Sequence, residues 1–268
     1  MPMPAEAPLP PISRRHTFNV VFGGLLVFAW IALWLWERSP YGRYLNHAEL
    51  GGFGHDPQSV SVLTQAALYI AGWLLMTTAM MLPTTLPLLD AFRRMTARRE
   101  DRHHLLALVI ASYLGVWLAF GIAAHLFDLG LHEAFEHVRW LQENPWIFGA
   151  GPLLLAGAFQ FSKLKYRCLD RCRAPVGFVI QHWRGGNAAV QSLAIGAHHG
   201  LFCIGCCWAL MLLMFAVGTG SVGWMLALGT VMAIEKNVSW GRRLSTPLGV
   251  ALLVWAAAIA LNHAWTWQ

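Results

Sequence analysis

The sequence predicts an all-α fold: a polytopic transmembrane bundle of about seven helices, with the N-terminus inside and the C-terminus outside. Hydrophobic residues make up 57% of the 268 residues and charged residues only 12%, whereas soluble domains carry about 25% charged residues. The hydrophobic residues form long runs separated by short charged segments, as a bilayer requires. Many tryptophans lie near the ends of those runs, where an interfacial aromatic belt is expected.

Seven hydrophobic runs are the expected membrane spans. The first follows Arg14 and Arg15, but it is longer than a signal-peptide core and no small-residue cleavage site follows it, so it is expected to be a retained helix. The fourth and sixth are shorter than the roughly 20 residues that a bilayer requires, so they are expected to depend on neighbouring helices and local thinning. The runs are 18–36, 60–82, 105–126, 146–161, 189–217, 222–234 and 247–264.

The distribution of charge predicts the orientation. With the N-terminus inside, all Lys and Arg residues except Arg38, Arg43 and Arg139 fall on the cytoplasmic side, as the positive-inside rule requires. The same distribution excludes a nucleic-acid partner, because the cations sit in short loops and no soluble face presents them. We therefore expect a disordered cytoplasmic N-terminus, 1–17, followed by one transmembrane helical domain, 18–268.

All five cysteines lie in one stretch of the chain, together with a pair of histidines. Cys168 and Cys172 are four residues apart, a spacing that places two thiols on one face of a helix. Histidine and cysteine recur at a similar spacing further along the chain. These are soft ligands, so the sequence predicts a bound metal ion, copper before zinc, although cysteine also packs as a small apolar residue. The predicted metal ligands are Cys203, Cys206, Cys207, His199, Cys168 and Cys172.

Three other segments carry candidate ligands. Three methionines at 76–81 precede two helix-breaking prolines, and thioethers favour Cu(I), although methionine also fills space between helices. Glu235 and Lys236 follow the sixth run, where an interfacial lysine is the commoner interpretation, although Glu235 becomes a functional candidate if the helix runs deeper. The segment 132–137 pairs His with Glu four residues apart, which suits either a divalent ion or a solvated acidic helix.

Three short sequences carry a resemblance to a known family: AMMLP at 79–83, CLDRCRAP at 168–175 and, most specifically, CIGCCW at 203–208. On these residues the chain resembles a bacterial family of predicted metal-binding integral membrane proteins, from about Trp73 to Glu235. The resemblance implies a multi-pass protein of the bacterial inner membrane that binds metal through these cysteines.

The leading functional prediction is a membrane protein that binds a soft metal through the Cys/His cluster and handles or delivers it. Its expected partners are the lipid bilayer and either a metal donor or acceptor protein or other subunits of a membrane complex. One alternative is a thiol–disulfide oxidoreductase in which Cys168 and Cys172 exchange electrons with Cys206 and Cys207. The other is a structural or assembly subunit. The sequence assigns no catalytic residue and leaves open whether the protein is an enzyme.

Overall fold

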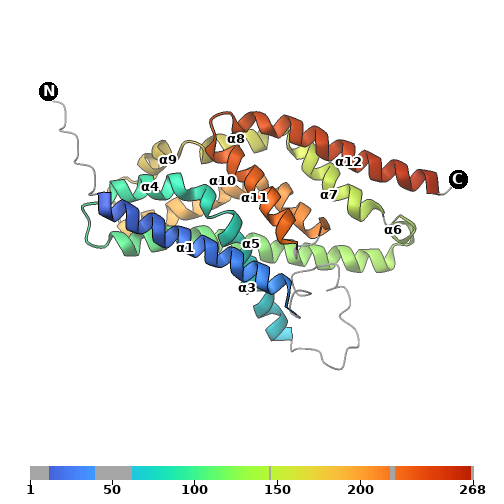
Figure 1. Cartoon of the computed structure of the whole chain (residues 1–268), viewed down its shortest axis with the longest axis horizontal. Helices are drawn as coiled ribbons and strands as arrows, with labels where there is room; N and C mark the ends of the chain where they lie inside the picture. Colours follow the sequence, from blue (N-terminus) through green and yellow to red (C-terminus); the bar gives the residue numbers. More distant parts are fainter. Residues whose placement is uncertain (1–11, 40–61, 145, 218–220, 267–268) are drawn as a thin grey trace.

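The computed structural model describes residues 12–39, 62–144, 146–217 and 221–266, and the regular structure of these residues is helical (Figure 1). The predicted all-α fold is therefore confirmed. Residues 1–11 of the predicted N-terminal segment lie outside the described residues. The helices are α1 (Ile12–Glu37), α3 (Val62–Met80), η2 (Pro83–Thr85), α4 (Leu86–Met95), α5 (Arg102–His137), α6 (Arg139–Glu143), α7 (Trp146–Phe159), α8 (Lys163–Cys172), α9 (Pro175–His182), α10 (Ala188–Val217), α11 (Val222–Asn237), η3 (Gly241–Leu244) and α12 (Ser245–Thr266).

The described helices include four that are long and apolar enough to cross a membrane: α1, α5, α10 and α12. Two bent pairs raise the number of candidate spans to six if each pair counts as one span. The helix α3 bends by 44° into the segment that contains η2 and α4, and α7 bends by 66° into α8. The predicted count of seven also includes α11, which has only 16 residues. That count and the orientation of the termini stay predictions.

The bend after α3 follows from its proline. Pro83 lacks a backbone N–H, so helical hydrogen bonding is interrupted where η2 begins. Two threonine hydroxyls make local hydrogen bonds at the break: Thr84 Oγ1 donates to the Met81 oxygen and Thr85 Oγ1 to the Leu82 oxygen, both at 2.7 Å. The backbone N–H groups of the same two threonines also donate to these oxygens. Because the polar groups of both threonines are satisfied within the chain, they are tolerated among buried residues.

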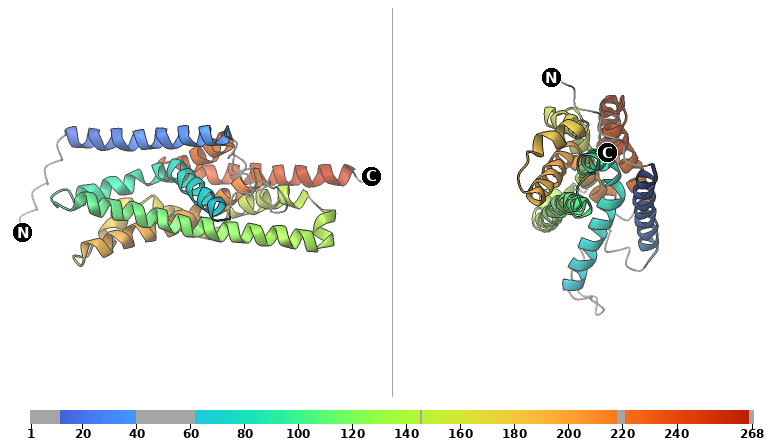
Figure 2. Two further views of the ribbon diagram at one scale, coloured as in Figure 1. Left: turned by 90° about the horizontal axis from the view of Figure 1, so that it is seen from below. Right: turned by 90° about the vertical axis from the view of Figure 1, so that its left-hand side faces the viewer.

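The closest helix packing lies between α5, the longest described helix, and α10 (Figure 2). Gly196 and Gly200, four residues apart on α10, face α5. A Cβ at Gly196 would lie 2.1 Å from the Val109 carbonyl oxygen, and a Cβ at Gly200 would lie 3.1 Å from Val116 Cβ. Small residues at this spacing let two helix backbones approach closely. The contact fixes α10, which carries three of the five cysteines.

The helices α8 and α11 complete the surroundings of those cysteines. A Cβ at Gly205 of α10 would lie 2.5 Å from Cys168 Sγ of α8, so α8 packs directly on the α10 backbone. A Cβ at Gly229 of α11 would lie 3.5 Å from Met80 Cγ of α3. The middle of α10 is therefore enclosed by α5, α8, α11 and the end of α3.

Candidate metal centre

Three sulfur atoms from two segments meet in the core of the bundle. Cys203 and Cys207 lie one turn apart on α10 and are 0% and 1% exposed. Met81 follows α3 at the proline break, and its Sδ lies 4.0 Å from Cys207 Sγ. The break after α3 thus brings a thioether to the two thiols.

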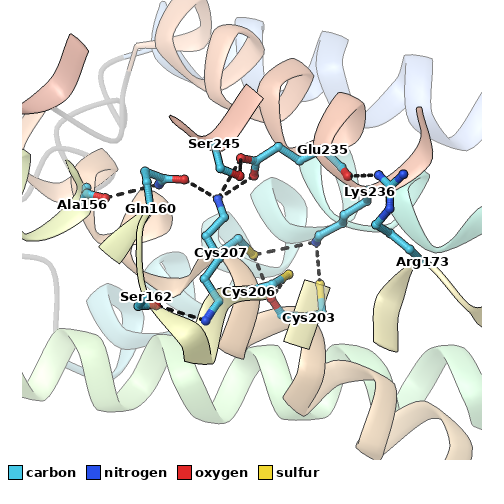
Figure 3. Close-up of polar contacts among 11 residues, drawn as sticks. Ala156, Gln160, Ser162, Arg173, Cys203, Cys206, Cys207, Glu235, Lys236 and Ser245 are labelled. Atoms are coloured by element: carbon cyan, nitrogen blue, oxygen red, sulfur yellow. Dashed lines mark hydrogen bonds and ion pairs between the residues drawn. The ribbon is translucent and has the colours of Figure 1, made fainter. Parts of the chain in front are cut away.

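The side chain of Lys236, from the end of α11, points into these sulfurs (Figure 3). Its Nζ lies 2.9 Å from Cys203 Sγ, 3.8 Å from Cys207 Sγ and 3.9 Å from Met81 Sδ. The same Nζ lies 3.4 Å from Thr84 Oγ1. We call Cys203, Cys207, Met81 and Lys236 the sulfur–lysine cluster.

A buried ammonium group requires a compensating anion. In the described part of the chain, Lys236 forms no ion pair with a carboxylate, and its nearest partner is the Cys203 thiol. An ammonium group at these distances stabilises the thiolate form of Cys203 or Cys207 over the thiol form. Tyr113, on α5, completes the polar surroundings because its hydroxyl lies 3.1 Å from Cys203 Sγ.

A second buried cluster holds the residue next to Lys236. Glu235 accepts hydrogen bonds from Lys165 Nζ at 2.8 Å on both carboxylate oxygens, and from Ser245 Oγ at 2.7 Å. Gln160 also accepts a hydrogen bond from Lys165 Nζ. Both members of this ion pair are buried, at 0% and 2% exposure. The pair joins α8 to the end of α11 and so fixes the position from which Lys236 reaches the sulfurs.

The expectation of an interfacial lysine at the end of this run is wrong. Lys236 is 6% exposed and Glu235 is 2% exposed. Adjacent residues of a helix point in different directions, so Glu235 meets Lys165 while Lys236 meets the thiols. The two residues therefore belong to separate clusters, and of the two only Glu235 has an ion-pair partner in the described structure.

The other predicted ligands lie around the cluster. The Cys206 side chain interacts with those of Cys203, Cys207 and Cys172, and its Sγ donates to the Cys203 carbonyl oxygen at 3.0 Å. Cys168 packs against α10 at Gly205. His199 is 3% exposed, and its Nδ1 has no hydrogen-bond partner in the described structure.

Among the described residues, no three His, Cys, Asp or Glu side chains lie together so that they could hold one ion. The assignment of all six predicted ligands to a single site stays a prediction. All five cysteines are free thiols.

The segment at 132–137 forms the end of α5. Its Glu133 and His137 side chains pair at 3.5 Å and are 73% and 70% exposed. The side chains of His132 and Glu136 lie outside the described residues. The Glu133–His137 pair is exposed to solvent, which agrees with the interpretation of this segment as a solvated acidic helix.

Comparison with family models matches residues 70–259 to a family described as PpoB2, copper chaperone. This match covers more than half of the chain. The chain belongs to the PpoB2 copper chaperone family. No curated protein and no solved structure matches it.

Membership of the PpoB2 family confirms the predicted relationship to a metal-handling family and supports copper as the metal. The matched region contains the whole sulfur–lysine cluster and the buried ion pair. The matched region begins within α3 and ends within α12, so it leaves out α1.

Proposed function

We propose that this protein is a membrane copper chaperone that binds Cu(I) between Cys203, Cys207 and Met81 and passes it to an acceptor protein. The observation that carries the proposal is the position of Lys236, whose ammonium group lies among these three sulfurs. The sulfur–lysine cluster is buried, is lined with sulfur and holds one positive charge. Such a site suits a monovalent soft cation.

The ligand chemistry favours copper over zinc. Thiolate and thioether ligands select Cu(I), whereas structural zinc sites have four protein ligands in a tetrahedron. The sulfur–lysine cluster offers two thiols and one thioether. The described residues around it do not supply the further Cys, His or carboxylate ligands that zinc requires.

Exchange of Lys236 for copper conserves charge. When Cu(I) enters, the ammonium withdraws from Cys203 and Cys207, one positive charge replaces another, and any proton still held by either thiol passes to water. When an acceptor removes Cu(I), the ammonium returns. The sulfurs are then never left as uncompensated buried anions, a state that costs several kcal/mol. This exchange would allow tight binding together with release, which delivery requires.

The membrane setting follows from the same bundle. Four to six candidate spans and the predicted excess of cations at one side support a multi-pass protein with its N-terminus in the cytoplasm. We propose the bacterial inner membrane as its location. The proposed partners are a copper donor or acceptor protein.

The test is anaerobic titration of the purified protein with Cu(I) against a chromogenic chelator. The wild-type protein should bind about one equivalent, and Cys203→Ser combined with Cys207→Ser should lose it. Cys168→Ser is the matched control, because that thiol packs against Gly205 and does not contact the cluster. One full equivalent in the double variant would exclude this site.

One observation favours a second candidate function. The Cys172 side chain of α8 and the Cys206 side chain of α10 interact with each other, and two neighbouring thiols are what a thiol–disulfide oxidoreductase needs. Formation of that disulfide releases two electrons and two protons to an external dithiol-disulfide partner. Mass spectrometry after rapid thiol trapping decides the matter: a Cys172–Cys206 disulfide that changes with redox buffer supports the cycle, and its absence excludes it.

A further inference from the structure

One face of α10 carries a soft metal ligand on each successive turn between His199 and Met214. The spacings along this face are four, four, four and three residues, which keep the side chains on a single stripe of the helix. None of the five is more than 3% exposed. The residues are His199, Cys203, Cys207, Met211 and Met214, and we call them the α10 ladder.

The α10 ladder is long compared with a binding site. His199 and Met214 are fifteen residues apart, and a helix rises about 1.5 Å per residue, so the ladder extends over about 22 Å. The hydrocarbon core of a bilayer is about 30 Å thick. The ladder is therefore long enough to cover most of the hydrocarbon core. Cys203 lies toward its His199 end, and Cys207 lies near its middle.

Methionines from two other segments lie along the same interface. Met76 and Met80 come from the end of α3, Met81 follows it directly, and Met225 and Met232 come from α11. All five are 2% exposed or less. The Met81–Cys207 contact joins the first group to the ladder, and the contact of Met80 with α11 at Gly229 joins it to the second.

Two polar groups beside these sulfurs have no hydrogen-bond partner in the described structure. They are His199 Nδ1, at one end of the α10 ladder, and Thr77 Oγ1, one turn before Met81. Both residues are buried, at 3% and 0% exposure. Buried polar groups are normally satisfied, so this imidazole nitrogen and this hydroxyl oxygen are free to interact with a ligand at either position.

We propose that the α10 ladder is a path along which Cu(I) moves through the bundle, between the His199 end and the Met214 end. This proposal rests on the proposed function, with the Cys203–Cys207 pair as the tightest position on the path. Thioether ligands bind Cu(I) but carry no charge, so Met211 and Met214 would hold the ion more weakly than the thiols and release it onward.

Methionine also fills irregular space in cores, and the experiment must separate packing from ligation. Leucine matches methionine closely in volume, so Met→Leu keeps the packing and removes the sulfur. The test uses proteoliposomes that contain the full-length protein and trapped bicinchoninate, a Cu(I) chelator, with Cu(I) supplied outside under reducing conditions. The rate at which the trapped chelator changes colour measures the passage of Cu(I).

Met211→Leu and Met214→Leu should each reduce the passage of Cu(I) at least tenfold. The affinity of the detergent-purified variants for Cu(I) should stay within threefold of the wild-type value, because the Cys203–Cys207 pair is intact. Met95→Leu is the control, since Met95 is 36% exposed at the end of α4 and lies off the ladder.

Wild-type passage in both ladder variants would overturn the path, and so would a wild-type rate equal to that of protein-free vesicles. Either result would exclude the path but not the proposed chaperone site, provided that the titration still finds one equivalent of Cu(I) whose binding depends on Cys203 and Cys207. Failure of the titration itself would show instead that the proposed function is wrong.

Discussion

At the scale of single residues, the two buried lysines show how this bundle treats charge. Lys165 is paired with a carboxylate, whereas Lys236 is surrounded by sulfur. Both are inside the bundle, but only the partners of Lys236 are also ligands for a soft cation. The first lysine is therefore expected to stabilise the fold and the second to serve copper exchange.

The substitution Lys236→Leu should slow the transfer of bound Cu(I) to a chelator at least tenfold. Without the ammonium, no cation returns to Cys203 and Cys207 when copper leaves, so release leaves buried negative charge uncompensated. Stopped-flow mixing of the copper-loaded protein with bicinchoninate measures the rate. Lys163→Leu, at an exposed position of α8, serves as the control. Unchanged or faster release from Lys236→Leu would contradict the exchange.

The substitution Glu235→Gln should destabilise the protein by about 3–5 kcal/mol, because Lys165 would remain buried without its counter-ion. Asp170→Asn is the matched control. It breaks the ion pair with Arg242, whose side chains are 52% and 50% exposed, and should cost less than about 1 kcal/mol. Thermal unfolding of both variants in the same detergent makes the comparison. Equal losses would show that the buried pair has no special role.

At the scale of elements, the contact between α5 and α10 controls the position of the thiols. Gly196→Ala would place a methyl group 2.1 Å from the Val109 carbonyl oxygen, and because backbone cannot yield as a flexible side chain can, the two helices would have to separate. We expect a marked fall in thermal stability and loss of Cu(I) binding. Gly115→Ala, on α5 with nothing within 4 Å of the added methyl, should be tolerated. Normal stability in Gly196→Ala would refute this account of the packing.

Hydrophobic runs predicted where the long helices lie, because a bilayer-type core requires them. They did not predict every end: α5 continues to His137, well past the end of its run at residue 126, since polar residues can extend a helix. The spacing of Cys203 and Cys207 was sufficient to predict that they share a face. The contacts of Met81 and Lys236 with these two thiols could not be predicted, because they depend on how three helices pack. Tyr113 gave no sequence signal at all.

At the scale of the whole molecule, the distribution of charge predicts a topology that can be measured. Reporter fusions that report cytoplasmic or external location should place the segment between α4 and α5 in the cytoplasm, because it contains a cluster of arginines. A fusion after α6 should report the external side. The opposite pattern at both positions would invert the proposed orientation.

The neighbouring positions of Glu235 and Lys236 have a consequence for how an acceptor could recognise the loaded protein. Arg173 donates a hydrogen bond to the carbonyl oxygen of Glu235 and another, at 2.8 Å, to that of Ser239. Any turn of this helix end that withdraws Lys236 from the thiols must also shift those two carbonyl groups. The presence of copper in the interior would then change the hydrogen bonds of Arg173, a partly exposed side chain that an acceptor protein could contact.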